Sequence, residues 1–226
     1  MSKRKFFIPI IDGDKTFEEM FVEFKYFTGF AISQKQKSIG SFHSAIRALN
    51  IGYNPLEIST KSTELLGQKL SAFNLTYYHN GAYLPIECIF QSSKVFENGS
   101  QFTELMFLSP RDAKRDERLR NSGRIVKFKF DDEDWATEPK TMFYDWIYIV
   151  ALASNSHLVQ EVVKYNAFTD IEFNHEKSIN CQARSVAIFV SLYKNGKLNE
   201  CLASKDKFKE IYKKHIQPVQ MTLFDI

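Results

Sequence analysis

The chain has 226 residues, 44% of them hydrophobic and 15% aromatic, and a formal net charge of +3. This length and apolar content allow a sizeable core and favour one large domain. So small a net charge excludes a strongly basic, non-specific nucleic-acid binder, although local basic segments can still contact phosphates. The 21 phenylalanines and 10 tyrosines suit both core packing and the stacking of bases.

The chain has three cysteines and five histidines. The cysteines are too few and too widely spaced for a disulfide framework, and the histidines show no paired metal spacing. We therefore expect no metal, no cofactor and a reducing cytoplasmic setting. The apolar run at residues 6–11 is too short for a signal peptide, and no stretch reaches transmembrane length. A soluble protein without membrane contact is the expectation.

The first third of the chain predicts strands followed by short helices. Residues 6–11 read as a strand, and residues 20–26 as a second strand, although a helix could also begin at Phe17. Residues 41–49 read as a helix capped by Ser41, and residues 62–66 as a short helix that ends at Gly67. Asn80-Gly81 then favours the tight turn of a hairpin between residues 70–78 and 82–84.

From Pro85 onward the pattern is mainly helical. Pro85 is placed to begin a helix. The predicted elements that follow are a charged helix at 111–121, a strand at 124–130, an acidic loop at 131–134, and helices at 141–154, 157–166 and 182–193. This order favours an α+β fold that is mainly helical with a small sheet and an N-terminal extension, rather than a parallel sheet.

The best chemical clue lies in residues 85–96. If this whole segment is helical, Glu87, Gln91 and Lys94 share one face at steps of four and three. A carboxylate, an amide and an amine then line one pocket. The alternative, more usual for this spacing alone, is a surface helix with a weak ion pair.

A wider set of segments carries a resemblance to a known family. In chain order these segments are Leu70-Ser71-Ala72-Phe73, the helix with Glu87, Phe90, Gln91 and Lys94, Ser109–Arg115, Asp134-Trp135, and residues 142–152 and 155–163. They resemble the NADAR (YbiA-like) family of N-glycosidases over about residues 70–192. The family's histidine after the glutamate is Cys88 here. Its terminal Val-Glu and Asn positions are matched only loosely, by Thr169–Glu172 and Asn180.

Upstream segments indicate the branch of that family. Residues 24–27, 33–39 and 57–62 resemble NADAR proteins found beside DNA ADP-ribosylating toxins of the DarT type. The resemblance implies an antitoxin that removes ADP-ribose from guanine bases in DNA, with ADP-ribosylated DNA and a DarT-type toxin as partners. Two alternatives stay open. One is an N-glycosidase of small metabolites such as riboflavin-pathway intermediates, and the other is a non-catalytic antitoxin that binds its toxin.

The resemblance also implies roles for individual residues. Neutral Lys94 attacks the ribose anomeric carbon to give a Schiff base, and Glu87 moves protons. The expected substrate-binding residues are Ser71, Phe73, Gln91, Trp135, Asn180 and Arg184. Structural roles are the alternatives. Ser71, Gln91 and Asn180 could each be a capping or turn residue, and Trp135 could be a core anchor. Arg184 could be a structural or solvated arginine. A further cluster, made of Lys35, Lys37 and Lys61, is a candidate for steering DNA or the pyrophosphate. The alternative is that these lysines form an ordinary solvated surface.

The same reading divides the chain into three parts. Residues 1–69 are expected to elaborate the domain, residues 70–198 to form the catalytic core, and residues 199–226 to form a charged helix and a tail. In the tail, Gln220, Leu223 and Phe224 resemble the short peptides that dock on the bacterial sliding clamp. A tail that folds back on its own domain is the alternative.

Overall fold

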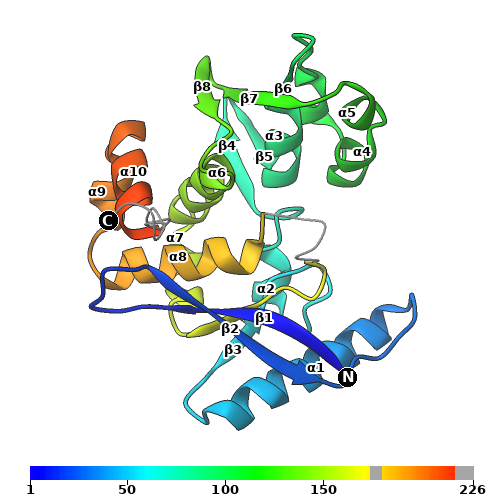
Figure 1. Ribbon diagram of the computed structural model, residues 1–226, viewed down its shortest axis with the longest axis vertical. Helices are drawn as coiled ribbons and strands as arrows, with labels where there is room; N and C mark the ends of the chain where they lie inside the picture. Colours follow the sequence, from blue (N-terminus) through cyan, green and yellow to red (C-terminus); the bar gives the residue numbers. More distant parts are fainter. Residues whose placement is uncertain (174–179, 217–226) are drawn as a thin grey trace, which may run out of the picture.

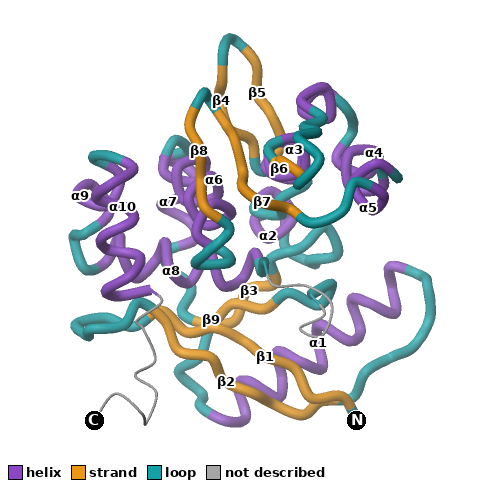
Figure 2. The backbone as a smooth tube through the Cα atoms, turned by 45° about the horizontal axis from the view of Figure 1, so that its top comes forward, coloured by secondary structure: helices purple, strands orange, loops and turns teal. Residues whose placement is uncertain are grey.

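The computed structural model describes residues 1–173 and 180–216, which form an α+β fold with three sheets (Figures 1 and 2). The largest sheet has the strand order β2-β1-β9-β3. Its strands are β1 (Ser2–Pro9), β2 (Phe17–Phe24), β3 (Pro55–Glu57) and β9 (Ala167–Thr169). β1 is antiparallel to β2 and β9, whereas β3 is parallel to β9. The sheet thus joins the first sixty residues to a strand in the last third of the chain.

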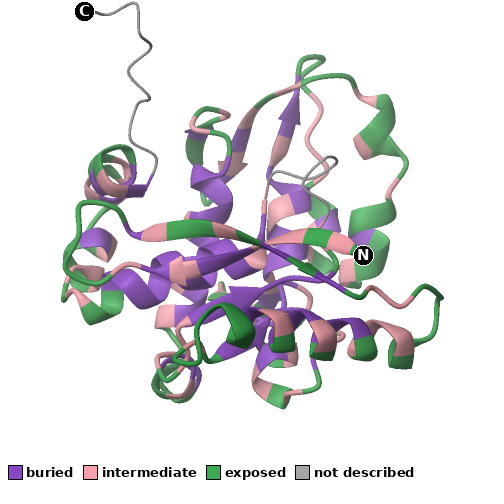
Figure 3. Cartoon of the chain, turned by 60° about the horizontal axis from the view of Figure 1, so that its bottom comes forward, coloured by how far each residue is buried: buried purple, intermediate pink, exposed green. Residues whose placement is uncertain are grey.

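Two helices cover opposite faces of this sheet (Figure 1). α1 (Ile32–Leu49) packs on β2 and β3, and α8 (Gln182–Lys194) packs on β1 and β9. Successive side chains of a strand point to opposite faces. Accordingly Phe6 lies in the core cluster under α1, whereas Phe7 lies in the larger cluster that includes α8. One face of α1 remains exposed (Figure 3), so this helix is an outer layer.

Several predicted elements in this half are confirmed, and two helix boundaries were wrong. The strand assignments for residues 6–11 and 20–26 are correct, although β2 begins earlier. α1 begins nine residues before Ser41, which is no cap but accepts a hydrogen bond from the Lys25 backbone N–H. α2 spans Leu65–Lys69 rather than ending at Gly67. Gly67 is instead buried inside it, where a Cβ would come within 1.9 Å of the Glu57 carbonyl oxygen.

The hairpin is confirmed as β4 (Thr76–His79) and β5 (Ala82–Pro85), and Asn80 and Gly81 both have positive φ. Positive φ at both central residues is the geometry that Asn-Gly tolerates in a tight turn. α3 (Ile86–Ser92) follows at once. A third sheet then forms from β6 (Lys94–Phe96), β7 (Ile125–Phe130) and β8 (Glu133–Ala136), in that order.

Two further expectations need correction here. The acidic run at 131–134 is not wholly a loop, because only Asp131 and Asp132 make the turn and β8 begins at Glu133. Both turn residues have positive φ, which aspartate accommodates better than most residues. The charged helix at 111–121 is divided into α4 (Pro110–Arg115) and α5 (Arg118–Asn121). At this break, Asp116 accepts hydrogen bonds from the Arg118 guanidinium.

The remaining helices pack around the core. The predicted pair is confirmed as α6 (Met142–Ala153) and α7 (Ser156–Val162), although α7 ends four residues before the predicted boundary. α8 is buried nearly throughout. Short helices complete the described chain: η1 (Thr103–Phe107), α9 (Leu198–Leu202), α10 (Lys205–Ile211) and η2 (Tyr212–Ile216). Within the described residues, no helix has the length and apolar content needed to cross a membrane.

Candidate functional site

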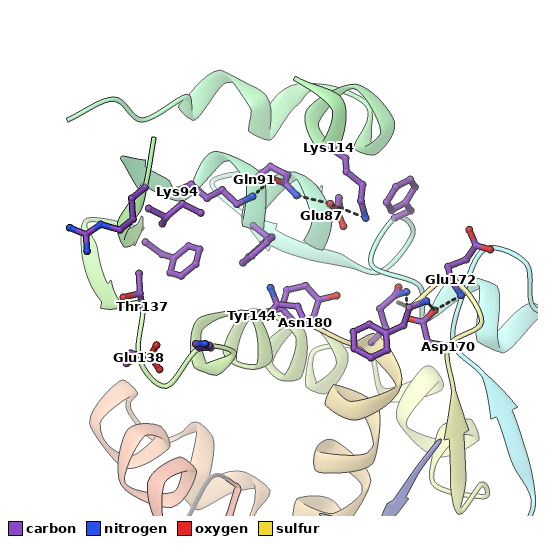
Figure 4. A pocket seen from close by; sticks show the side chains of 18 residues that line it. Glu87, Gln91, Lys94, Lys114, Thr137, Glu138, Tyr144, Asp170, Glu172 and Asn180 are labelled. Atoms are coloured by element: carbon purple, nitrogen blue, oxygen red, sulfur yellow. Dashed lines mark hydrogen bonds and ion pairs between the residues drawn. The ribbon is translucent and has the colours of Figure 1, made fainter. Parts of the chain in front are cut away.

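A pocket of about 760 Å³ opens between the third sheet with α3 on one side and α6 with the start of α8 on the other. Figure 4 shows Glu87, Gln91, Lys94 and Lys114 along one wall, with Tyr144 and Asn180 on the facing side. We call it the lysine pocket. Its lining residues are Phe73, Glu87, Phe90, Gln91, Lys94, Lys114, Arg124, Ile125, Phe128, Thr137, Glu138, Lys140, Tyr144, Asp170, Glu172, Phe173, Asn180 and Gln182.

Glu87 and Gln91 lie one turn apart on α3, which places both side chains on the same face. The expectation that Lys94 continues this helical face was wrong. α3 ends at Ser92, and Lys94 is the first residue of β6, where it pairs with Phe128 of β7. Sheet pairing with a strand more than thirty residues away ends the helix. The lysine nevertheless reaches the same pocket wall as Gln91.

The polar groups on this wall form a continuous chain of contacts. Lys94 Nζ donates to Gln91 Oε1 at 2.5 Å, and Gln91 Nε2 donates to Glu87 Oε1 at 2.7 Å. Lys114 Nζ, from α4, lies 3.5 Å from the same Glu87 oxygen. The ion pairs among the described residues include none between Lys94 and Glu87, so the amide of Gln91 stands between them.

Burial governs the charge of Lys94. Desolvation lowers the pKa of this amine from 10.5 to about 8, the Glu87 carboxylate opposes that change, and the Lys114 ammonium adds to it. The Phe90 ring, 5.0 Å from Nζ, supplies part of the apolar surroundings. At pH 7 a pKa near 8 leaves about a tenth of the amine neutral, roughly 300 times the fraction of an unperturbed lysine. A neutral amine is a nucleophile, so the pocket favours amine chemistry.

Aromatic rings form the apolar part of the pocket. Phe90 packs on Phe128 with centroids 5.4 Å apart and meets Tyr144 edge to face at 5.3 Å. Phe73 lies further along the wall, with the Lys114 ammonium 5.4 Å from its ring. Such surfaces accept the flat faces of nucleobases and also exclude water from the amine.

The far end of the pocket is held by a glutamine at the start of α8. Gln182 Nε2 donates to Asp170 Oδ2 at 3.0 Å, and its Oε1 accepts from the backbone N–H of Ala72. Asp170 also accepts from the backbone N–H groups of Glu172 and Phe173. Burial, together with the nearby Glu57 carboxylate, raises the pKa of Asp170. This end is therefore a polar junction between the segment after β9, the start of α8 and the loop that joins α2 to β4.

Four of the sequence-predicted binding residues lie at a pocket. Gln91, Phe73 and Asn180 line the lysine pocket, and Asn180 Oδ1 is buried with no hydrogen-bond partner among the described residues. Ser71 lines an adjoining pocket, but its hydroxyl already donates to the Gln68 carbonyl. These placements leave Gln91, Phe73 and Asn180 as proposed substrate contacts.

Trp135 and Arg184 lie elsewhere and line neither pocket. Trp135 is 2% exposed and packs against Trp146 and Phe143, with ring centroids 5.5 and 5.6 Å apart. Its position corresponds to the alternative of a core anchor and does not support base stacking.

The placement of Arg184 does not support the expected phosphate contact either. Its guanidinium donates to Asp145 at 2.5 Å, to Thr141 at 2.8 Å and to the Tyr212 hydroxyl at 3.2 Å. Only 8% of the residue is exposed. A buried guanidinium with these partners ties α8 to α6 and η2 and is already neutralised by Asp145.

Sequence reasoning missed several lining residues. Lys114 was visible only as part of Ser109–Arg115, one of the segments that resemble the family, and that resemblance was the available signal. Tyr144 reads as an ordinary core residue of an apolar helix. Gln182 carries no local signal, because its partners Ala72 and Asp170 are distant in sequence.

Two other expectations concern features apart from this wall. Gln220, Leu223 and Phe224, the residues of the possible sliding-clamp peptide, lie outside the described residues. Across the ranges 1–173 and 180–216, no group of three or more His, Cys, Asp or Glu side chains is arranged to hold a metal ion.

Comparison with known proteins places this pocket in a family context. No curated protein sequence matches the chain. A family model described as the DarT1-associated NADAR antitoxin matches residues 2–221, nearly the whole chain. The protein therefore belongs to the DarT1-associated NADAR antitoxin family, whose toxin partner is of the DarT type.

Proposed function

We propose that this antitoxin is an N-glycosidase that removes ADP-ribose from guanine bases in DNA. The observation that carries the proposal is the half-buried Lys94 amine, whose pKa is lowered to about 8 and which is linked to Glu87 through Gln91. NADAR proteins are generally N-glycosidases, and the family of this chain is associated with a DarT-type toxin. An enzyme that removes the toxin's product needs no stoichiometric contact with the toxin.

In the proposed reaction, the lone pair of neutral Lys94 Nζ forms a bond to the ribose anomeric carbon. The bond from that carbon to the guanine nitrogen breaks, and its electron pair goes to the base. The two protons of the amine end on the guanine nitrogen and on the ring oxygen as the ribose ring opens. A Schiff base then joins Nζ to the anomeric carbon.

Hydrolysis completes the cycle. The imine nitrogen is protonated, water adds to the imine carbon, and the carbon–nitrogen bond breaks to release ADP-ribose and the amine. Glu87, which reaches Lys94 through one amide, is the group placed to move protons between Nζ, the base and water. Lys114 Nζ, 3.5 Å from Glu87 Oε1, is a second basic group beside this carboxylate.

A trapping experiment tests the proposal. The substrate is an oligonucleotide with one ADP-ribosylated guanine, and the readouts are free ADP-ribose and, after cyanoborohydride reduction, a covalent adduct seen by mass spectrometry. Wild type should release ADP-ribose and form the adduct at Lys94. Lys94→Met should do neither, whereas Lys127→Met, which removes a half-buried lysine of β7 outside the pocket, should do both.

The same variants separate the alternatives. If wild type releases no ADP-ribose from the oligonucleotide, the DNA assignment is wrong, and N-glycosides of small metabolites become the substrates to assay. If Lys94→Met protects cells from the toxin as well as wild type does, the antitoxin acts by binding and not by catalysis.

A further inference from the structure

A second pocket of about 350 Å³ adjoins the lysine pocket. The two share Phe73, Lys114, Glu172 and Gln182 as common walls. We call the second one the basic pocket. Its other lining residues are Ser59, Thr60, Lys61, Ser71, Arg111 and Arg115. Four of its ten lining side chains are cationic and only Glu172 is acidic.

Among the described residues, few carboxylates balance the positive charge of the basic pocket. Lys61, Arg111 and Arg115 form no ion pair with any carboxylate of the described residues, and Glu172 pairs with Lys35 at 3.2 Å. The two acidic residues closest in sequence are engaged elsewhere. Asp112 accepts from the Ser109 hydroxyl, and Asp116 accepts from Arg118.

The local structure concentrates this charge rather than dispersing it. Arg111, Lys114 and Arg115 stand at steps of three and four along α4, so all three share one face. Like charges at these spacings destabilise a helix. A bound anion removes that repulsion, whereas a merely solvated face retains it.

Within the described residues, the hydrogen-bond donors that remain free in the basic pocket restrict the kinds of ligand that it can bind. The hydroxyls of Ser59 and Ser71 already donate to Glu57 and Gln68. The guanidinium and ammonium groups, together with the Thr60 hydroxyl, are therefore the side-chain donors left for a ligand. Paired arginines bind the oxygens of phosphates in bidentate geometry, which suits a pocket lined by four cationic side chains and one carboxylate.

The position of Lys114 relates this pocket to the proposed reaction. Its ammonium lines both pockets and lies 3.5 Å from Glu87, so the basic pocket begins one side chain away from the reacting groups. ADP-ribosylated DNA carries phosphates close to the reacting carbon on both sides, in the pyrophosphate and in the backbone next to the modified guanine. Either lies within a nucleotide's length of that carbon.

We propose that the basic pocket is a phosphate-binding subsite for the ADP-ribosylated substrate, with Arg111, Arg115 and Lys61 as its anchoring residues. The inference rests on the proposed function for the identity of the substrate. The phosphate comes either from the pyrophosphate of ADP-ribose or from the DNA backbone, and binding measurements distinguish these two sources.

The test uses full-length wild type, Arg111→Ala, Arg115→Ala and the matched control Arg120→Ala. Arg120 is exposed on the neighbouring α5 and lines neither pocket. Its replacement by alanine removes the same charge. Two probes are titrated, ADP-ribose by calorimetry and an unmodified single-stranded oligonucleotide by fluorescence anisotropy at several salt concentrations. Thermal unfolding confirms that each variant is folded, which is expected because both pocket arginines are exposed.

We expect each pocket variant to weaken at least one probe about fivefold or more relative to Arg120→Ala. If only the affinity for ADP-ribose falls, the pocket binds the pyrophosphate. Loss for the oligonucleotide, with a salt slope smaller by about one, assigns the DNA backbone. The proposal is overturned if both variants bind both probes within about twofold of the control, or if wild type binds neither probe.

These binding results are independent of turnover. If wild type binds a probe through the basic pocket but releases no ADP-ribose from modified DNA, the subsite stands and the proposed hydrolysis fails. If wild type hydrolyses modified DNA and the pocket variants match the control in binding and KM, the hydrolysis stands and the subsite fails.

Discussion

Replacing Lys94 by methionine should make the protein more stable at neutral pH. The amine is held in surroundings that lower its pKa from 10.5 to about 8. That difference corresponds to about 3 kcal/mol of unfavourable free energy in the folded state, at about 1.4 kcal/mol per pKa unit. Methionine removes this cost but leaves Gln91 Oε1 without its donor, a loss of about 1 kcal/mol. The expected net gain is about 2 kcal/mol at pH 7.

The lowered pKa of Lys94 also determines how the stability of wild type changes with pH. Between pH 8 and 10.5 the unfolded lysine keeps its proton while the folded one has lost it, so wild type becomes more stable as pH rises through this window. The advantage of Lys94→Met should therefore be present at pH 7 and lost by about pH 10.5. Urea unfolding at pH 7 and pH 9.5 measures it, with Lys69→Met as an exposed control expected within about 0.5 kcal/mol of wild type. A variant less stable than wild type at pH 7, or an advantage that does not change with pH, refutes the reasoning.

Three further predictions concern the neighbours of this amine and the buried arginine. Glu87→Gln should slow single-turnover release of ADP-ribose by about 10²- to 10⁴-fold, and a loss below about tenfold would argue against a proton-transfer role. The wild-type rate should rise with pH through an apparent pKa of about 8. In Gln91→Leu, Lys94 and Glu87 can pair directly, so the apparent pKa of the rate profile should rise by about one unit or more. An unchanged apparent pKa would show that the amide does not separate the charges. Asp145→Asn leaves the Arg184 guanidinium buried without its counter-charge and should cost about 3–5 kcal/mol in urea unfolding; retention of full stability would contradict that account.

Local patterns in the sequence predicted the elements whose structure depends on residues that are close in sequence. A short apolar run identified β1, and alternating apolar residues indicated β2. Asn80-Gly81 identified the hairpin because few other residue pairs accept positive φ at both positions. The start of α1 was missed because its first turns, residues 32–37, are largely polar and show no apolar period. Their helical state depends on burial further along the helix, at Ile39, Phe42 and Ile46.

The candidate site could be predicted only as far as its residue types. Glu87, Gln91 and Lys94 were chosen on the premise of a continuous helix, yet Lys94 lies on a strand whose partner, Phe128, is distant in sequence. Likewise the contact of Lys114 with Glu87 joins α4 to α3. Pairings between elements so far apart leave no trace in local periodicity, so the proposed residues were brought to one pocket by a structure that the sequence reasoning had partly wrong.

The order of groups on the pocket wall bears on how one site can hold both a nucleophilic amine and a carboxylate. Direct contact with Glu87 would favour the ammonium form of Lys94, which has no lone pair for attack. The intervening Gln91 accepts from Lys94 and donates to Glu87, so it orients both groups without letting the charges touch. In the proposed reaction, the two protons that the guanine nitrogen and the ring oxygen need are the two that Nζ loses. The site then requires no external acid for bond cleavage, only a group that carries protons a short distance, and a carboxylate one amide away from the amine meets that requirement.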